Sequence, residues 1–195
     1  MTFEWRNSLC VSGAKDGTLA MWDINAGEAV KTFKAHKGPV QKIHLYSDGL
    51  DANIVVTGGQ SDGLINVYDM RMSKLVACEQ MHKGSVNFID TTLSNIIVTG
   101  ATDKKLKKMD ILKGFKSAGG MDTTDAVICG KTLGSLAVVG SGDGNILTFD
   151  LDSNQCLFGY GADPAGAVNC LGITPSSDAL ITGGDSGQAL KINFK

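Results

Sequence analysis

The amino-acid sequence predicts an all-β protein made of repeated antiparallel units of four short strands. Short apolar segments alternate with turns along the chain, and no stretch keeps the three-to-four-residue apolar spacing of an amphipathic helix. The 195 residues include 25 Gly and only 3 Pro, which suits many tight turns between strands. Because a small four-stranded sheet cannot bury both faces alone, we expect the units to stack radially as a β-propeller.

A hairpin-like segment recurs five times along the chain. Each copy has an apolar strand ending near Ser/Thr-Gly, a turn that usually contains Asp-Gly, and a second strand that ends at Asp or Asn. The copies are residues 8–23, 53–69, 95–110, 135–150 and 178–193. Their closing residues are separated by 46, 41, 40 and 43 positions, close to the roughly 40–45 residues of a four-stranded propeller blade. Weaker strand candidates, such as 28–33 and 39–45, lie between the hairpins.

Specific motifs in these segments resemble the WD-repeat family. GAKDGTLAMWD (13–23) is similar to the family signature, including the Trp-Asp dipeptide, and AHKGPV (35–40) and MHKGSV (81–86) resemble its Gly-His element. The resemblance covers essentially the whole chain and implies a single propeller region, 1–195, with about five blades. We place the blades at 1–34 (incomplete), 35–80, 81–120, 121–161 and 162–195 (incomplete). Since rings of this family most often have seven blades, we expect part of a larger ring or an open ring.

The resemblance also implies a structural hydrogen-bonded network within each blade. In the family it joins a His before the first strand, a Ser or Thr on the second, an Asp in the turn and a Trp on the third. The matching residues here are Ser12, Asp16, Trp22, His36, Thr57, Asp62, Tyr68, His82, Thr99, Asp103 and Asp143. Departures are Tyr68, Met109 and Ile192 at Trp positions, Val139 at a Ser/Thr position, Ser186 at a turn-Asp position, and Asp122 or Asp163 near missing His positions. Since no blade keeps all four residue types, we expect these blades to depend more on apolar packing.

Composition and cysteine usage argue against several functional classes. The net charge is −2, without the basic excess typical of nucleic-acid binders. Five widely spaced cysteines without a CxxC pair predict neither a disulfide framework nor a zinc site. No apolar run approaches the roughly 18 residues of a membrane span, and the first residues do not resemble a signal peptide. We therefore expect a cytoplasmic, non-secreted protein without a membrane partner.

Catalytic and cofactor motifs are weak in this sequence. GSGDGN (140–145) resembles a phosphate-binding loop but precedes a strand instead of a helix. DLDSNQ (150–155) begins like a calcium loop but lacks its Gly and its bidentate Glu. The turn aspartates occupy equivalent positions in successive blades, whereas a pair for acid–base catalysis lies within roughly 5–10 Å. We therefore predict no enzyme activity, no cofactor and no metal, with a propeller hydrolase as the weakest alternative.

Lysines concentrate on one hairpin arm, KKLKKMD (104–110). Lys108 stands at the position of Met21 and Val67, so its stem could pack between blades while its ammonium reaches water. Alternatively, the Lys104–Lys108 arm could bind an acidic partner or an RNA backbone through Lys104, Lys105 and Lys107. Apart from this arm, we do not expect nucleic acid to be a partner.

The resemblance implies a scaffold that binds other proteins, as a subunit of a larger assembly. Family partners commonly contact residues just before the turn Asp and at the start of the first strand. The candidate partner-binding residues at these positions include Lys15, Gln41, Ser61, Asn87, Thr102, Asn169 and Asp185. Another chain, or a segment outside this sequence, is expected to complete the ring. The sequence alone does not identify the partner.

Overall fold

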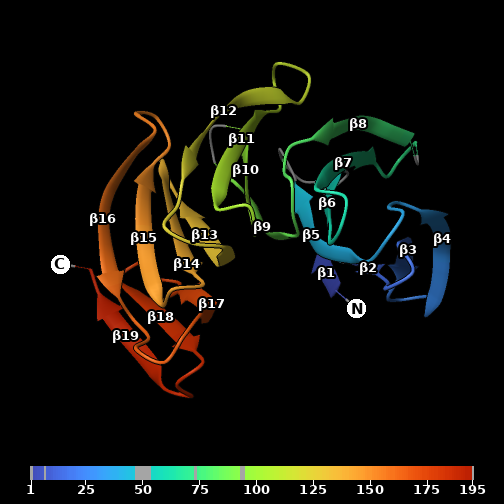
Figure 1. Ribbon diagram of the computed structural model, residues 1–195. Helices are drawn as coiled ribbons and strands as arrows, with labels where there is room; N and C mark the ends of the chain where they lie inside the picture. The colour runs from blue at the N-terminus through green and yellow to red at the C-terminus, as the bar shows by residue number, and fades with distance from the viewer. Residues whose placement is uncertain (1, 7, 47–53, 73, 93–94, 195) are drawn as a thin grey trace. The chain divides into compact units, whose positions relative to one another are not determined.

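The computed structural model describes residues 2–6, 8–46, 54–72, 74–92 and 95–194 (Figure 1). The described residues form nineteen strands and no helix. They therefore include no helix that is long and apolar enough to cross a membrane. The strands pair with their sequence neighbours in antiparallel sheets, which confirms the predicted all-β fold class. The chain divides into two compact units, Met1–Ile89 and Asp90–Lys195, and each is described by itself below.

The first unit contains two complete four-stranded sheets. One has β1 (Thr2–Arg6), β2 (Leu9–Gly13), β3 (Thr18–Asp23) and β4 (Glu28–Lys34), in that order. The other has β5 (Val40–Tyr46), β6 (Ile54–Gly59), β7 (Leu64–Asp69) and β8 (Lys74–Gln80). The boundary between the two units falls within β9 (Val86–Thr91), the first strand of the third sheet.

The second unit contains the remaining strands of the described chain. The third sheet continues with β10 (Ile96–Ala101), β11 (Lys105–Asp110) and β12 (Lys116–Asp122). The fourth has β13 (Val127–Leu133), β14 (Leu136–Ser141), β15 (Asn145–Asp150) and β16 (Gln155–Gly161). The fifth has three strands, β17 (Val168–Ile173), β18 (Ala179–Gly184) and β19 (Ala189–Asn193).

The first sheet differs from the expectation that residues 1–34 form an incomplete blade. Four strands are present, because β1 pairs with β2 over the whole of its length, from Thr2 opposite Gly13 to Arg6 opposite Leu9. A five-residue strand with mixed polar and apolar residues has no clear period, so sequence pattern alone does not reveal it. The correction adds a first strand to this blade.

Burial is concentrated on the middle strands of each sheet. Almost every residue of β6 and β7 is buried, whereas almost every residue of β8 and β16 is exposed. The near-continuous apolar runs of the middle strands, such as Ile54–Val56, suit strands that are covered on both faces. Each fully buried Val, Ile or Leu contributes about 1.5–3 kcal/mol through removal from water.

A glycine–valine contact joins successive sheets within each unit. The glycine follows the Ser/Thr position of the second strand, and a Cβ built on it would lie 2.5–2.7 Å from a Val Cγ1 of the following sheet. The pairs are Gly13 with Val40, Gly58 with Val86, Gly100 with Val127 and Gly140 with Val168. The residue two positions before each glycine (Val11, Val56, Val98 or Val138) is buried. The Ser/Thr-Gly step of the repeat therefore permits close packing of one sheet on the next.

Candidate functional site

The polar network predicted from the repeat is best developed in the second sheet. His36 lies at the turn before β5 and is buried, with Nδ1 3.1 Å from Asp62 Oδ2 and Nε2 2.9 Å from Thr57 Oγ1. Thr57 is fully buried on β6, and Asp62 lies in the turn that follows it. The structure therefore brings together three predicted residues. Tyr68, at the Trp position, instead donates its hydroxyl hydrogen to the Ala35 carbonyl, at 3.3 Å.

The first sheet contains a shorter part of this network. Trp22 Nε1 donates to Ser12 Oγ at 2.9 Å, while Asp16 Oδ1 accepts from the Thr18 backbone N–H at 2.9 Å. That backbone hydrogen bond is the main cause of a lowered pKa at Asp16.

In the third sheet, the predicted residues lie at positions equivalent to those of the second. His82 is buried, and Thr99 Oγ1 donates to the Lys107 carbonyl at 3.4 Å. Asp103 is half-buried in the turn before β11. Met109 is fully buried at the Trp position, so apolar packing replaces an indole hydrogen bond there.

The fifth sheet keeps the hydrogen bond between the His position and the turn-Asp position, but with different residues. Asp163 is buried, and its Oδ2 accepts from the Ser186 hydroxyl at 2.7 Å and from the Ser186 backbone N–H at 3.0 Å. These two hydrogen bonds lower the pKa of Asp163. The backbone N–H of Asp163 donates to Gly144 O, as that of His36 donates to Gly17 O, so Asp163 occupies the His position. Asp122, the other candidate near a missing His, is exposed and pairs with Lys105 instead.

Asp143 organises the turn between β14 and β15. Its Oδ1 accepts from Ser141 Oγ at 2.5 Å and from the Asn145 backbone N–H at 3.2 Å. Burial acts to raise the pKa of this carboxyl, but hydrogen bonds from Ser141, Thr124 and Asn145 outweigh it and lower the pKa to about 2. The ionised form is therefore the one that the turn stabilises.

Asp143→Asn is expected to reduce the acid sensitivity of the fold. Because the folded pKa of about 2 lies below the ordinary Asp pKa of 3.8, the carboxylate's contribution to stability is fully present above pH 3.8. It is lost as the pH falls through about 2. Urea midpoints measured between pH 5 and pH 2 should fall less steeply for the variant than for the parent chain. Parallel curves for the two proteins would show that this carboxyl does not contribute.

The candidate partner-binding residues lie mainly in exposed turns and at strand starts. Lys15, Ser61, Thr102, Asn169 and Asp185 are exposed, while Gln41 and Asn87 are half-buried. Gln41 Nε2 donates to Asn87 Oδ1 at 3.4 Å, and Asn169 Nδ2 donates to Asp185 Oδ1 at 2.7 Å. These contacts join first-strand residues to a neighbour, so part of their polar capacity is already used.

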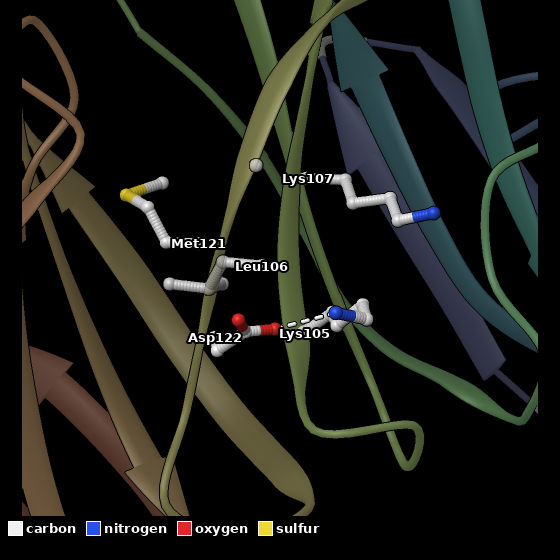
Figure 2. Close-up of a pocket in the computed structure, with 6 residues that line it drawn as sticks. Lys105, Leu106, Lys107, Met121 and Asp122 are labelled. Atoms are coloured by element: carbon white, nitrogen blue, oxygen red, sulfur yellow. Dashed lines mark hydrogen bonds and ion pairs between the residues drawn. The ribbon is translucent and has the colours of Figure 1, made fainter.

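Two lysines of the lysine arm form ion pairs with nearby carboxylates. Lys104 Nζ lies 2.8 Å from Asp125 Oδ1, and Lys105 Nζ lies 2.5 Å from Asp122 Oδ1 (Figure 2). A small cavity of about 270 Å³ lies beside the second ion pair, and the Lys107 and Met121 side chains extend to opposite sides of it (Figure 2). Surface pairs of this kind add little stability, but they reduce the local positive charge. The arm is therefore a mixed-charge surface.

Lys108 differs from the expectation of an ammonium that reaches water. It is buried, and its Nζ donates to the carbonyl oxygen of Leu151 in the following sheet. A buried ammonium needs such a partner because an unpaired charge would be strongly unfavourable. Lys108 is therefore an internal contact of the second unit and not part of a charged docking surface.

The described residues do not gather into a metal-binding cluster. Within the described ranges, no group of three or more His, Cys, Asp or Glu residues is placed to hold a metal ion. All five cysteines are free thiols, and three of them, Cys78, Cys156 and Cys170, are exposed. Two features were not predicted from the sequence: the buried amide of Asn66 and the exposed face of the fifth sheet.

Comparisons with curated proteins give two distant relatives, and no protein-family model matches the chain. It is 23% identical over 185 residues to autophagy-related protein 16 of Arabidopsis thaliana, covering 94% of this chain and 36% of that protein. It is 40% identical over 43 residues to p21-activated protein kinase-interacting protein 1-like of Xenopus laevis, covering 22% of this chain and 12% of that protein. The chain therefore spans about a third or less of these relatives.

Solved structures match the chain almost from end to end. The computationally designed Ika8 protein matches with a TM-score of 0.83 and 25% identity, covering 98% of this chain and 57% of that one. A chain of the mitotic checkpoint complex matches with a TM-score of 0.88 and 18% identity, covering 99% of this chain and 61% of that one. U3-55K matches with a TM-score of 0.84 and 15% identity, covering 95% of this chain and 57% of that one. The last two are WD-repeat propeller proteins. At such identities the likeness shows the fold, and this chain has the β-propeller fold of four-stranded antiparallel blades.

Proposed function

We propose that this chain is a non-catalytic WD-repeat scaffold that binds other proteins as a subunit of a larger assembly. The fold supports this class, and one chain of similar fold belongs to the mitotic checkpoint complex. The observation that carries the proposal is the exposed face of the fifth sheet, which has the features of a blade contact without a following blade.

The fifth sheet has the glycine of the glycine–valine contact, but no valine of another described sheet packs against it. Gly183 follows Thr182 as the other glycines follow their Ser/Thr positions, yet no valine of another sheet lies within 4 Å of a Cβ built there. Ile181, at the position of Val98 and Val138, is 46% exposed, whereas those two are 0% and 4% exposed. An apolar side chain is therefore exposed on this sheet at a position where the equivalent residue of the other sheets is covered.

The repeat geometry identifies the occupant that this face fits. Each equivalent face in the two units receives the first strand of the following sheet, with a valine against the glycine. The partner is therefore a further blade-like sheet that presents a valine to Gly183. Under this proposal, the sheet belongs to a partner protein.

Affinity capture from the native source, read by quantitative mass spectrometry, tests the scaffold proposal. The chain should recover a stoichiometric partner, and Ile181→Asp should reduce its recovery by at least tenfold because a charge would be buried in the contact. Val30→Asp, at an exposed valine of β4, is the matched control and should recover the partner normally. Equal recovery with Ile181→Asp would place the contact elsewhere. A chain that recovers no stoichiometric partner would contradict the scaffold function.

A further inference from the structure

The outer strand of the fourth sheet, β16, differs in composition from the other outer strands. β4, β8 and β12 each carry at least two charged residues, whereas β16, with the sequence QCLFGYG, carries none. Every residue of β16 is exposed, including the large apolar side chains of Leu157, Phe158 and Tyr160. Charged residues usually prevent an edge strand from pairing with another chain. The edge of β16 lacks this protection.

Regular pairing extends along one half of β16. The strand pairs with β15 without interruption from Phe158 to Gly161, and the register shift lies between Cys156 and Phe158. Because alternate residues of a strand share a face, Phe158 and Tyr160 lie on one face of the sheet, with Gly159 between them. β16 is the last strand of its sheet, so its outer edge pairs with no other strand of the described chain (Figure 1).

The two aromatic side chains of β16 are less covered than the equivalent residue of the third sheet. Tyr160 lies opposite Ile146 on β15, as Met121 lies opposite Leu106 on β11. Met121 is 8% exposed, whereas Tyr160 is 51% exposed and Phe158 is 58% exposed. The two rings therefore leave apolar area in water beside an unpaired strand edge, and a second strand would cover it.

We propose that β16 pairs antiparallel with β16 of a second copy of this chain, about a two-fold axis at Gly159. In this register, Phe158 of each copy lies opposite Tyr160 of the other, which gives two aromatic cross-strand pairs. Such pairs stabilise antiparallel strands. The two Gly159 residues meet at the axis and place no side chain between the strands. The same short segment thus supplies both halves of the contact, as a two-fold interface requires.

The same register on the other outer strands gives no comparable pair. The residues at the position of Gly159 are Thr32 on β4, Cys78 on β8 and Gly120 on β12. Pairing about them would place Lys31 opposite Phe33, Ala77 opposite Glu79, and Gly119 opposite Met121. The first two pairs set a charge against an apolar side chain, and the third has only one side chain. Self-pairing is therefore specific to β16 among these strands.

The proposed dimer goes beyond the scaffold function and does not depend on it. A contact made by one strand edge is expected to be smaller than the roughly 1,200–2,000 Å² of a stable protein interface. Dimerisation should therefore be reversible and depend on concentration. The open face of the fifth sheet, which carries the scaffold proposal, is a different surface from the edge of β16.

Sedimentation velocity of the whole chain tests the dimer. The parent chain should shift from monomer to dimer as its concentration rises. Phe158→Glu should dimerise about tenfold more weakly or less, because it places a charge against an aromatic ring. Val30→Glu, which puts the same charge on an exposed residue of β4, should dimerise like the parent chain. Ile181→Asp should also leave dimerisation unchanged, which separates this proposal from the scaffold contact.

Charge complementation tests the register. Tyr160→Lys alone should weaken dimerisation, but an equal mixture of Phe158→Glu and Tyr160→Lys should form a heterodimer, because the introduced carboxylate and ammonium lie opposite each other. Amide hydrogen exchange gives an independent measurement. On dilution, exchange should accelerate at residues 158–161 and stay constant at residues 31–34 of β4.

Four results would overturn the proposal. They are a parent chain that stays monomeric at every concentration, a dimer that persists in Phe158→Glu, a dimer that is lost in Ile181→Asp, and a mixture of the two charged variants that forms no heterodimer. Protection of β16 that appears only when a different protein binds would also overturn it, because the edge would then receive a strand of that protein.

Discussion

Gly144→Ala is expected to lower the free energy of unfolding by about 3 kcal/mol or more. Gly144 has a φ of 82°, a left-handed conformation that costs an L-residue about 1–2 kcal/mol. A Cβ at this position would also overlap the carbonyl oxygen of Asp163 and lie 2.6 Å from that of Gly166. The backbone would have to move away, which would weaken the hydrogen bonds from Ala162 and Asp163 to the Gly144 carbonyl. Urea unfolding followed by circular dichroism measures the loss.

Gly187→Ala provides the matched control for this prediction. Gly187 occupies the same turn position in the fifth sheet and has a φ of 72°, but no atom lies within 4 Å of a Cβ built there. Its substitution should therefore cost only the backbone strain, about 1 kcal/mol. Equal losses for the two variants would mean that close packing on the next sheet does not restrict Gly144.

The turns show how far the sequence predicted the fold. Asp-Gly pairs at 16–17 and 143–144 identified their hairpins, because the required left-handed residue is visible in the sequence. The third sheet uses Lys104 at the same position, with a φ of 62°, and only the repeat period predicted that turn. The short strand β1 has no comparable signal, so the first blade was expected to be incomplete.

The candidate site was less predictable because its contacts join distant parts of the chain. In the fifth sheet, Asp163 stands at the His position and Ser186 at the turn-Asp position, so neither residue alone indicates the hydrogen bond between them. The ion pairs of Lys104 and Lys105 depend on aspartates of the following strand and turn, which changes an apparently basic arm into a mixed-charge surface. The unsatisfied oxygen of Asn66 depends on Ala35, 31 residues away, and is invisible to any local pattern.

His36→Ala is expected to lower the free energy of unfolding by about 3 kcal/mol, the second large effect. The imidazole is buried, and its removal leaves a cavity and takes from Thr57 a hydrogen-bond partner in a fully buried position. Asp62 would lose its contact with Nδ1 but is partly exposed, so water can replace that partner. Lys37→Ala, at the adjacent exposed residue, should change stability by less than about 0.5 kcal/mol.

A double-mutant cycle shows whether His36 and Asp62 act as a connected pair or as two independent residues. If the 3.1 Å contact contributes to the fold, the combined loss in His36→Ala/Asp62→Ala should be smaller than the sum of the single losses, by about 1 kcal/mol. Because the His36 ring is buried, this coupling should be stronger than that of an exposed pair such as Lys105 and Asp122, even though the exposed pair is closer. Additive losses would contradict a cooperative network. The buried imidazole would then contribute through packing and its hydrogen bond to Thr57 alone.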